Sequence, residues 1–278
     1  KKKGCMDFFL EKMISLNNKN KISADDPKTF NNKEKLINKI RVNLGNRKML
    51  SDEYGLRIHY IDIGQVYMEE NKLIKHDLIL FPKSLLNNQE ILDFFNEKRD
   101  NIHKLLFGIC IYTLNEEASQ YNTEYKLGEQ YYKLLRKKNI QINEFIRRKL
   151  KQQIDKIKTG FFTKKQLYDF ISKRLRDNIP EKEKKKILDF ENLTQFLLYI
   201  RILLIDAYTI CRMFRIFKSA STLQNIVYYA GASHTYNISR FLEEIKFKLK
   251  HSYDTSNGYF TEERLAKVIP CIPLKMDN

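Results

Sequence analysis

The segment from Asn225 to Leu249 most constrains the fold, because it has the order of a strand, a glycine turn and an amphipathic helix. The run Asn225–Ala230 is short and apolar, as in a strand buried in a parallel sheet. Gly231 follows, and apolar residues then recur at helical spacing: Ile238, Phe241, Leu242, Ile245 and Leu249. This order is half of a βα unit. The sequence therefore predicts an α/β fold with a small, mostly parallel sheet.

A second strand is predicted at residues 56–63, which are rich in β-branched and aromatic residues and bounded by Gly55 and Gly64. Helical patterns fill most of the chain between the two strands. Pro82 and Ser84 precede the first of them, over residues 85–106. The second covers residues 116–217 and is punctuated at Gly128, Asn139, Gly160 and Pro180, with a capping box at Thr163-x-x-Gln166. We therefore expect a large, predominantly helical insertion.

The N-terminal residues 5–16 have the pattern of an amphipathic helix, and a second short helix is expected at about 33–43. These patterns divide the chain into three parts. Residues 1–115 form the N-terminal part of the α/β core, without an upstream strand; residues 116–217 form a basic helical region; and residues 218–278 form the C-terminal βα part. With 42% hydrophobic residues over 278 positions, the chain can bury a sizeable core.

Four widely spaced cysteines without a CxxC pair favour buried free thiols in a reducing compartment. The visible sequence does not open with a secretory signal. Its most apolar stretch, residues 193–217, contains Arg201, Asp206, Arg212 and Arg215, which argues against a membrane span. We expect an intracellular protein or one enclosed in a virus particle.

The sequence Gly231-Ala-Ser-His234 lies at the carboxyl end of the predicted C-terminal strand. Ligands bind at this edge of open α/β sheets, because loops and helix N-termini converge there. An imidazole at this position can bind a metal, act as a base or donate a hydrogen bond to an anion. The alternative is that His234 only caps the helix or bonds a neighbouring loop.

Two carboxylates are further candidates for the same site. Asp206 lies in an otherwise apolar helical segment, together with Arg212, and burying it is costly unless it has a partner. A plain ion pair, for example with Arg201, would also explain it. Asp62 follows the first strand and would reach the same sheet edge as His234 if the strands are parallel, although it also fits a turn carboxylate.

The segment Asn225–His234 resembles the second GxxH motif of the TraB/TIKI and erythromycin-esterase (ChaN)-like superfamily of α/β proteins. Taken with residues 57–63 and 206–215, it is also similar to uncharacterised proteins of giant DNA viruses, whose AT-rich genomes encode chains rich in Asn, Lys, Ile and Tyr. The resemblance covers about 40 of the 278 residues.

The resemblance implies an enzyme-like, metal-assisted hydrolase, or a degenerate relative of one. In it, His234 would be metal ligand or base, Asp62 and Asp206 carboxylate partners, and Arg212 an anion-stabilising group. The cofactor stays open, with a divalent metal as the candidate. The superfamily carries another strand-end motif with Glu or His, which this sequence lacks. The resemblance therefore implies either that this motif lies upstream of Lys1 or that the site is degenerate.

Other catalytic patterns are missing from the sequence. The remaining histidines, His59, His76, His103 and His251, are scattered without an HExxH or HxH spacing, so they do not predict a zinc site. The sequence contains neither GxxxxGK[ST] nor GxGxxG, which argues against the usual nucleotide sites. It also lacks the GxSxG elbow of serine hydrolases.

The middle of the chain is strongly basic. Residues 125–186 hold 20 Lys and Arg against 7 Asp and Glu, which is +13 of the total +17. Together with interleaved aromatic residues, this composition suits phosphate contacts and base stacking, with Arg147, Arg148, Lys149 and Lys151 as candidate contacts. The competing function is thus a non-enzymatic virion or scaffold protein that binds nucleic acid or an acidic partner. A helical layer with a solvated basic face would give the same composition.

Overall fold

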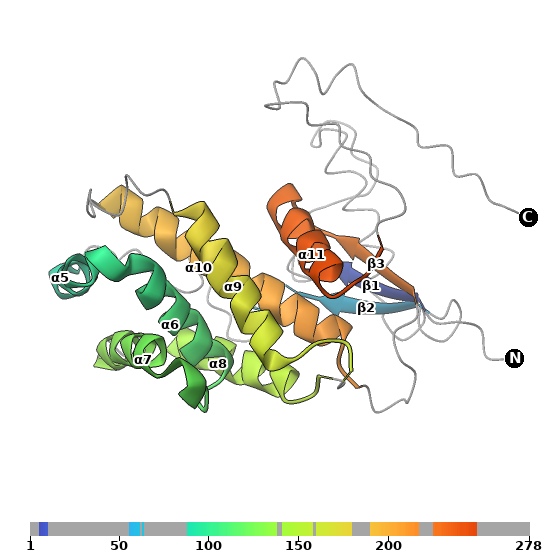
Figure 1. Ribbon diagram of the computed structural model, residues 1–278, viewed down its shortest axis with the longest axis horizontal. Helices are drawn as coiled ribbons and strands as arrows, with labels where there is room; N and C mark the ends of the chain where they lie inside the picture. Colours follow the sequence, from blue (N-terminus) through green and yellow to red (C-terminus); the bar gives the residue numbers. More distant parts are fainter. Residues whose placement is uncertain are drawn as a thin grey trace, which may run out of the picture.

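The structure is a computed structural model that describes residues 6–10, 56–61, 63, 88–137, 141–157, 160–179, 190–216 and 225–248. A small sheet lies beside a larger group of helices (Figure 1). The strands are β1 (Met6–Leu10), β2 (Leu56–Tyr60) and β3 (Asn225–Tyr229). The helices are α5 (Gln89–Glu97), α6 (Ile102–Leu114), α7 (Asn122–Lys137), α8 (Gln141–Ile154), α9 (Lys164–Asn178), α10 (Phe190–Met213) and α11 (Ala232–Glu244).

The sheet has the strand order β2-β1-β3, and β1 pairs in parallel with both neighbours. Phe9 at its centre lies opposite His59 on β2 and Tyr228 on β3. The prediction of a small parallel sheet with a large helical part between β2 and β3 is confirmed. The helix predicted at residues 5–16 is wrong over residues 6–10, which form the central strand; residues 11–16 lie outside the described part.

The error at β1 has a physical reason. The sequence of β1 lacks the alternation of polar and apolar residues that marks a half-buried strand, although Asp7 and Phe9 are buried and Met6 is exposed. The run Met6–Leu10 contains Asp7 as its only polar residue. Short apolar runs of this kind fit a helix turn and a strand equally well. The prediction that residues 1–115 lack a strand upstream of residue 56 is thus wrong, because β1 is such a strand.

β3 is parallel, as predicted, but the prediction that it is buried is wrong. Ile226, Val227 and Tyr229 are 39%, 38% and 41% exposed. Within the described sheet, β3 pairs with β1 alone, and a strand at such a position receives less cover than a central one. An apolar sequence here therefore does not mean full burial.

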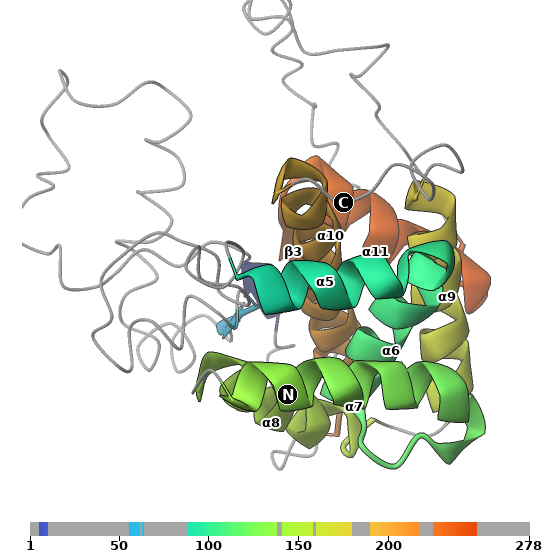
Figure 2. The ribbon, with the colours of Figure 1, turned by 90° about the vertical axis from the view of Figure 1, so that its left-hand side faces the viewer.

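Helix α6 is the centre of the helical group and contacts α7, α8, α9 and α10. Eleven of its thirteen residues are buried, which matches a sequence that is apolar on all sides rather than on one face. Figure 2 shows α5 and α7 in front of it. Helix α10 also contacts α11, so it connects the helical group with the βα part of the sheet.

Gly128 does not interrupt the helical pattern, contrary to the sequence prediction, because it lies inside α7. Its role is to let two helices approach closely. A Cβ atom at Gly128 would overlap the backbone of Gly108 on α6, and a Cβ at Gly108 would overlap the carbonyl of Glu124. These glycines are therefore explained by packing and not by chain reversal.

Other element boundaries follow local capping chemistry. Asn88 caps the first described helix, since its side chain accepts a hydrogen bond from the Glu90 amide at 3.0 Å. The predicted capping box is confirmed, because Thr163 and Gln166 bond each other's backbone amides. Gly160 precedes this box with a φ of 108°, a conformation that favours glycine. Residues 33–43, 82–87, Asn139 and Pro180 lie outside the described part.

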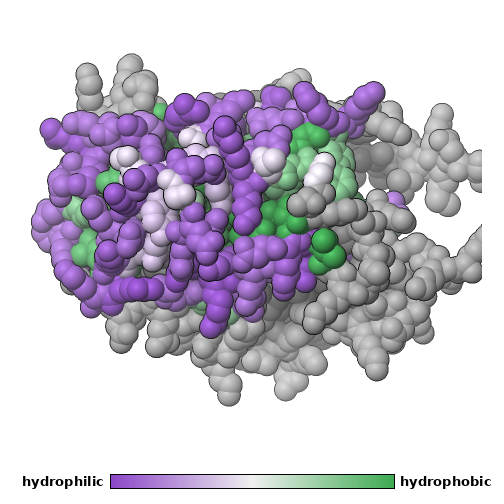
Figure 3. Space-filling view, turned by 60° about the horizontal axis from the view of Figure 1, so that its bottom comes forward, coloured by the Kyte–Doolittle hydropathy of each residue, from purple (hydrophilic) through white to green (hydrophobic). Residues whose placement is uncertain are grey.

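The face of the helices shown in Figure 3 is mostly hydrophilic. Among the described residues, no helix is both long and apolar enough to cross a membrane. Cys110 and Cys211 are buried and free, as the sequence predicted for the cysteines in general. Cys5 and Cys271 lie outside the described residues.

Candidate functional site

Two of the predicted site residues, Asp206 and His234, meet between α10 and α11. The His234 Nδ1 and Asp206 Oδ1 atoms are 2.6 Å apart. Asp206 is fully buried and His234 is 7% exposed. The contact forms because α11 packs against α10 directly after the β3 turn. A buried carboxylate thus has the partner that its burial requires.

The amide of Asn237, one turn further along α11, holds the other oxygen of this carboxylate. Asn237 Nδ2 donates to Asp206 Oδ2 at 2.7 Å, and Arg174 Nε on α9 donates to Asn237 Oδ1 at 2.9 Å. The carboxylate accepts from both sides, so the hydrogen-bond network assigns the proton of the neutral His234 ring to Nδ1. Nε2 is then the basic atom of the ring.

A second buried pair, Asp7 and His59, lies on the strands. His59 Nε2 and Asp7 Oδ1 are 2.7 Å apart, and both residues are buried. Arg212 Nε donates to His59 Nδ1 at 3.2 Å. Because an arginine can only donate, His59 Nδ1 is the acceptor of this bond. His59 Nε2 then carries the ring proton and donates a hydrogen bond to Asp7. Phe9 stacks on the ring at 4.5 Å between centroids.

Both ring nitrogens of His59 are therefore hydrogen-bonded to protein side chains. In His234, the nitrogen bonded to Asp206 is Nδ1. The His59 network joins β1, β2 and α10, and it fits a role in holding the sheet against that helix. Arg212 belongs to this network, and its Nη1 also donates to the Tyr208 hydroxyl at 3.2 Å. The structure thus connects Arg212 with His59 and not with Asp206 and His234.

The remaining predicted site residues are placed as follows. Asp62 lies outside the described residues. His234 and Asn237 are described partners of Asp206, and the ion pair considered between Asp206 and Arg201 stays a prediction. In the described part of the chain, no three His, Cys, Asp or Glu side chains gather into a group that could hold a metal ion. The metal ligand predicted at His234 stays a prediction.

Sequence reasoning missed Asp7, His59, Asn237 and Arg174. Asp7 had a visible signal, because a lone acidic residue inside an apolar run needs a partner, as Asp206 does. His59 alternates with apolar neighbours in a predicted strand, so it could have been placed on one face with Ile61. Asn237 and Arg174 carry no signal in the sequence, since only the packing of α9 and α11 brings them together.

The predicted phosphate-binding residues on α8 do not form one free set of cations. Arg147 pairs with Glu144, with Nη2 and Oε2 2.9 Å apart, and also with Glu116. Its side chain is 15% exposed and lies over the Tyr112 ring. Arg148 and Lys149 lie near the Phe145 ring, at 5.9 and 4.9 Å from its centroid. Arg147 is therefore held in a structural ion-pair cluster.

The two described cysteines are poor candidates for a nucleophile. Cys110 and Cys211 are buried in the helical core, and burial raises the pKa of each thiol above its usual value. A thiol is nucleophilic as the thiolate. Chemistry in this region would therefore depend on the imidazole and carboxylate groups of the Asp206–His234 pair.

No protein-family model, curated protein or solved structure matches this chain. The superfamily resemblance of residues 225–234 stays a prediction.

Proposed function

We propose that this chain is a hydrolase-type enzyme domain in which His234 is the base or a metal ligand. The supporting observation is the buried Asp206–His234 pair, 2.6 Å apart, at the turn that follows β3. Carboxylates orient catalytic histidines in this way, and they also support metal-bound histidines through the other ring nitrogen. We include in this proposal the assignment of the chain to the α/β fold class.

Each residue of the pair has a definite part in this proposal. Asp206 fixes the tautomer and orientation of the ring, and His234 Nε2 takes a proton from water or binds a divalent metal that activates the water. Asn237 is a positioning residue, because it acts on Asp206. The anion-stabilising role of Arg212 stays a prediction, and its Nε and Nη1 donate to His59 and Tyr208.

The test is hydrolysis of p-nitrophenyl acetate, p-nitrophenyl phosphate and bis-p-nitrophenyl phosphate by the full chain, before and after chelation and reloading with Mn²⁺ or Zn²⁺. We expect His234→Gln to lower the rate by about 10²-fold or more. His103→Gln is the control, because His103 is a partly buried histidine of α6 outside the site. Circular dichroism checks that each variant folds.

Metal content by elemental mass spectrometry separates the two roles of His234. A stoichiometric metal that is lost in His234→Gln assigns metal binding, whereas hydrolysis by a metal-free protein assigns the base. The proposal is overturned if the wild-type protein hydrolyses none of the three substrates, either with or without added metals. Full activity in His234→Gln overturns it as well.

A further inference from the structure

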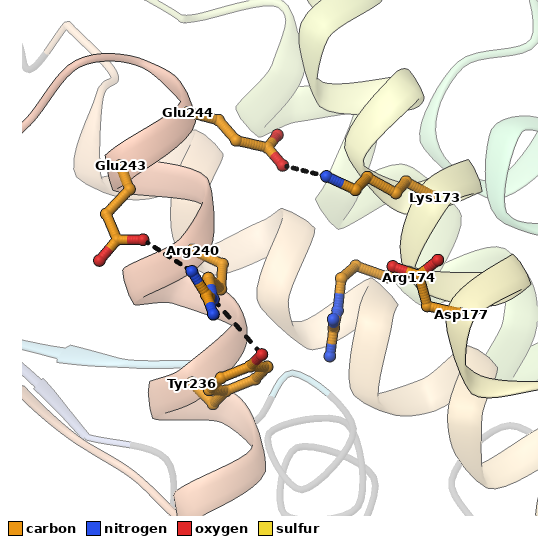
Figure 4. A pocket seen from close by; sticks show the side chains of 7 residues that line it. All are labelled: Lys173, Arg174, Asp177, Tyr236, Arg240, Glu243 and Glu244. Carbon is orange, nitrogen blue, oxygen red and sulfur yellow. Dashed lines mark hydrogen bonds and ion pairs between the residues drawn. The ribbon is translucent and has the colours of Figure 1, made fainter. Parts of the chain in front are cut away.

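A pocket of about 490 Å³ lies between α9 and α11. Three cations and three carboxylates line it: Lys173, Arg174 and Asp177 from α9, and Arg240, Glu243 and Glu244 from α11. Tyr236 lies among them (Figure 4). Two helices far apart in the sequence thus bring charged groups to one place that the proposed hydrolytic chemistry does not use.

The charges of this pocket are not fully matched by ion pairs. Lys173 pairs with Glu244 at 3.3 Å, and Arg240 pairs with Glu243 at 3.2 Å. Arg174 uses Nε for the hydrogen bond to Asn237. Within the described helices it has no carboxylate at ion-pair distance, although Asp177 lines the same pocket.

The guanidinium groups of Arg174 and Arg240 both lie beside the Tyr236 ring. The Cζ atoms of Arg174 and Arg240 lie 5.1 and 5.3 Å from the centroid of its ring. Arg240 Nε also donates to the Tyr236 hydroxyl at 3.3 Å. The hydrogen bond and positive charge of Arg240, together with Arg174, lower the pKa of Tyr236, as a concentration of positive charge should.

Arg174 is held in place by a hydrogen bond to Asn237. The bond from Nε to Asn237 fixes the side chain at one edge, and Figure 4 shows its guanidinium group extending into the space between the helices. A fixed guanidinium loses little conformational freedom when it binds an anion, so more of the interaction is available as affinity.

We propose that this α9–α11 pocket binds the phosphoryl group of a small phosphorylated molecule between Arg174 and Arg240. A tetrahedral dianion can accept hydrogen bonds from two guanidinium groups that approach from different helices. A planar carboxylate is matched by a single guanidinium. Binding here does not require His234 to be a base.

The test is titration of the full chain with inorganic phosphate by isothermal titration calorimetry, at an ionic strength kept constant with sodium chloride. We expect saturable binding that Arg174→Gln and Arg240→Gln each weaken by about tenfold, as for loss of a charge-assisted hydrogen bond. Arg99→Gln is the matched control, because Arg99 is 57% and Arg240 is 55% exposed. This control variant should bind phosphate as the wild type does.

Two further arms make the result decisive. Acetate replaces phosphate in the first, and we expect it to bind at least about tenfold more weakly, because it carries one charge instead of nearly two. In the second arm, His234→Gln is titrated with phosphate, and we expect it to keep the wild-type affinity. The phosphate-binding proposal therefore does not fail if the hydrolase proposal fails. Phosphate binding that is absent, or equally tight in Arg240→Gln and Arg99→Gln, overturns the proposal. Equal affinity for acetate overturns the assignment to phosphoryl groups.

Discussion

At the scale of single residues, the two buried aspartate–histidine pairs differ in which ring nitrogen faces the carboxylate. His59 presents Nε2 to Asp7, because Arg212 takes Nδ1 as an acceptor. His234 presents Nδ1 to Asp206. The same two residue types therefore give one ring bonded through both nitrogens and one ring held at Nδ1, the orientation on which the proposed chemistry at Nε2 depends.

Replacing Asp206 with Asn tests the energetic part of this picture. The new amide would place an NH₂ group against either Asn237 Nδ2 or His234 Nδ1, which are both donors. An unsatisfied buried donor costs about 1–3 kcal/mol, and we expect the free energy of unfolding to fall by that amount or more. Urea unfolding followed by circular dichroism measures it.

The control for this prediction is Asp169→Asn. Asp169 is exposed on α9 and accepts only a long hydrogen bond, 3.4 Å, from the Tyr121 hydroxyl. We expect this change to cost less than about 0.5 kcal/mol. Equal losses in the two variants would mean that the Asp206 network does not stabilise the fold.

The sequence identifies Asp206 and His234 as candidate site residues, but it does not predict that they contact each other. Asp206 stands out as an acid in an apolar helix, and His234 as an imidazole after a strand and a glycine. That they contact each other depends on how α11 packs on α10, and sequence patterns do not encode that geometry. Arg212 shows the same limit, since its position on α10 gave no sign that it reaches His59.

At the scale of elements, close helix packing explains glycines that local patterns interpret as breaks. Gly108 and Gly128 face each other where α6 meets α7, and both lie within helices. A helix-interior glycine normally costs about 1 kcal/mol relative to alanine. Its presence at both positions indicates that backbone contact between the helices repays this cost.

We therefore expect Gly128→Ala to destabilise the protein, against its gain in helix propensity. The added methyl group would overlap the backbone of Gly108, and overpacking of this kind costs about 1–3 kcal/mol. Gln130→Ala, an exposed change on the same helix, should stay within about 0.5 kcal/mol of the wild type. A thermal midpoint that rises in Gly128→Ala would contradict the close packing.

Elements were predictable where local chemistry decides them. The capping box at Thr163 needs only two side chains three residues apart, and it is present as expected. The strands β2 and β3 were recognised from β-branched and aromatic runs. β1 was not, because its mostly apolar run lacks the alternation of polar and apolar residues that would distinguish a strand from a helix turn.

At the scale of the whole molecule, the basic helical region supports a competing hypothesis, in which the chain binds nucleic acid. If it does, affinity should fall steeply between 50 and 200 mM salt, because bound cations release counterions from the phosphates. Replacing Arg148, Lys149 and Lys151 together with Gln should reduce the salt slope by about 2–3 and show no base preference. Fluorescence anisotropy with a labelled oligonucleotide measures both.

Arg147 serves as the contrast within the same segment. Arg147 pairs with Glu144 and Glu116. We therefore expect Arg147→Gln to lower the free energy of unfolding by more than it lowers the free energy of binding to the oligonucleotide. Affinity that does not depend on salt, or that the triple replacement leaves unchanged, would exclude the nucleic-acid hypothesis for these residues.

The strand order carries a consequence for how the protein is made. β1 lies between β2 and β3, and almost the whole chain separates Met6 from its partner Asn225. During synthesis on the ribosome, one edge of β1 therefore has to wait for β3 until the entire helical region has emerged. An open apolar strand edge is a template for pairing with other chains. Nascent copies of this protein thus carry an aggregation hazard at this edge of β1 until β3 arrives, whichever helices have already folded.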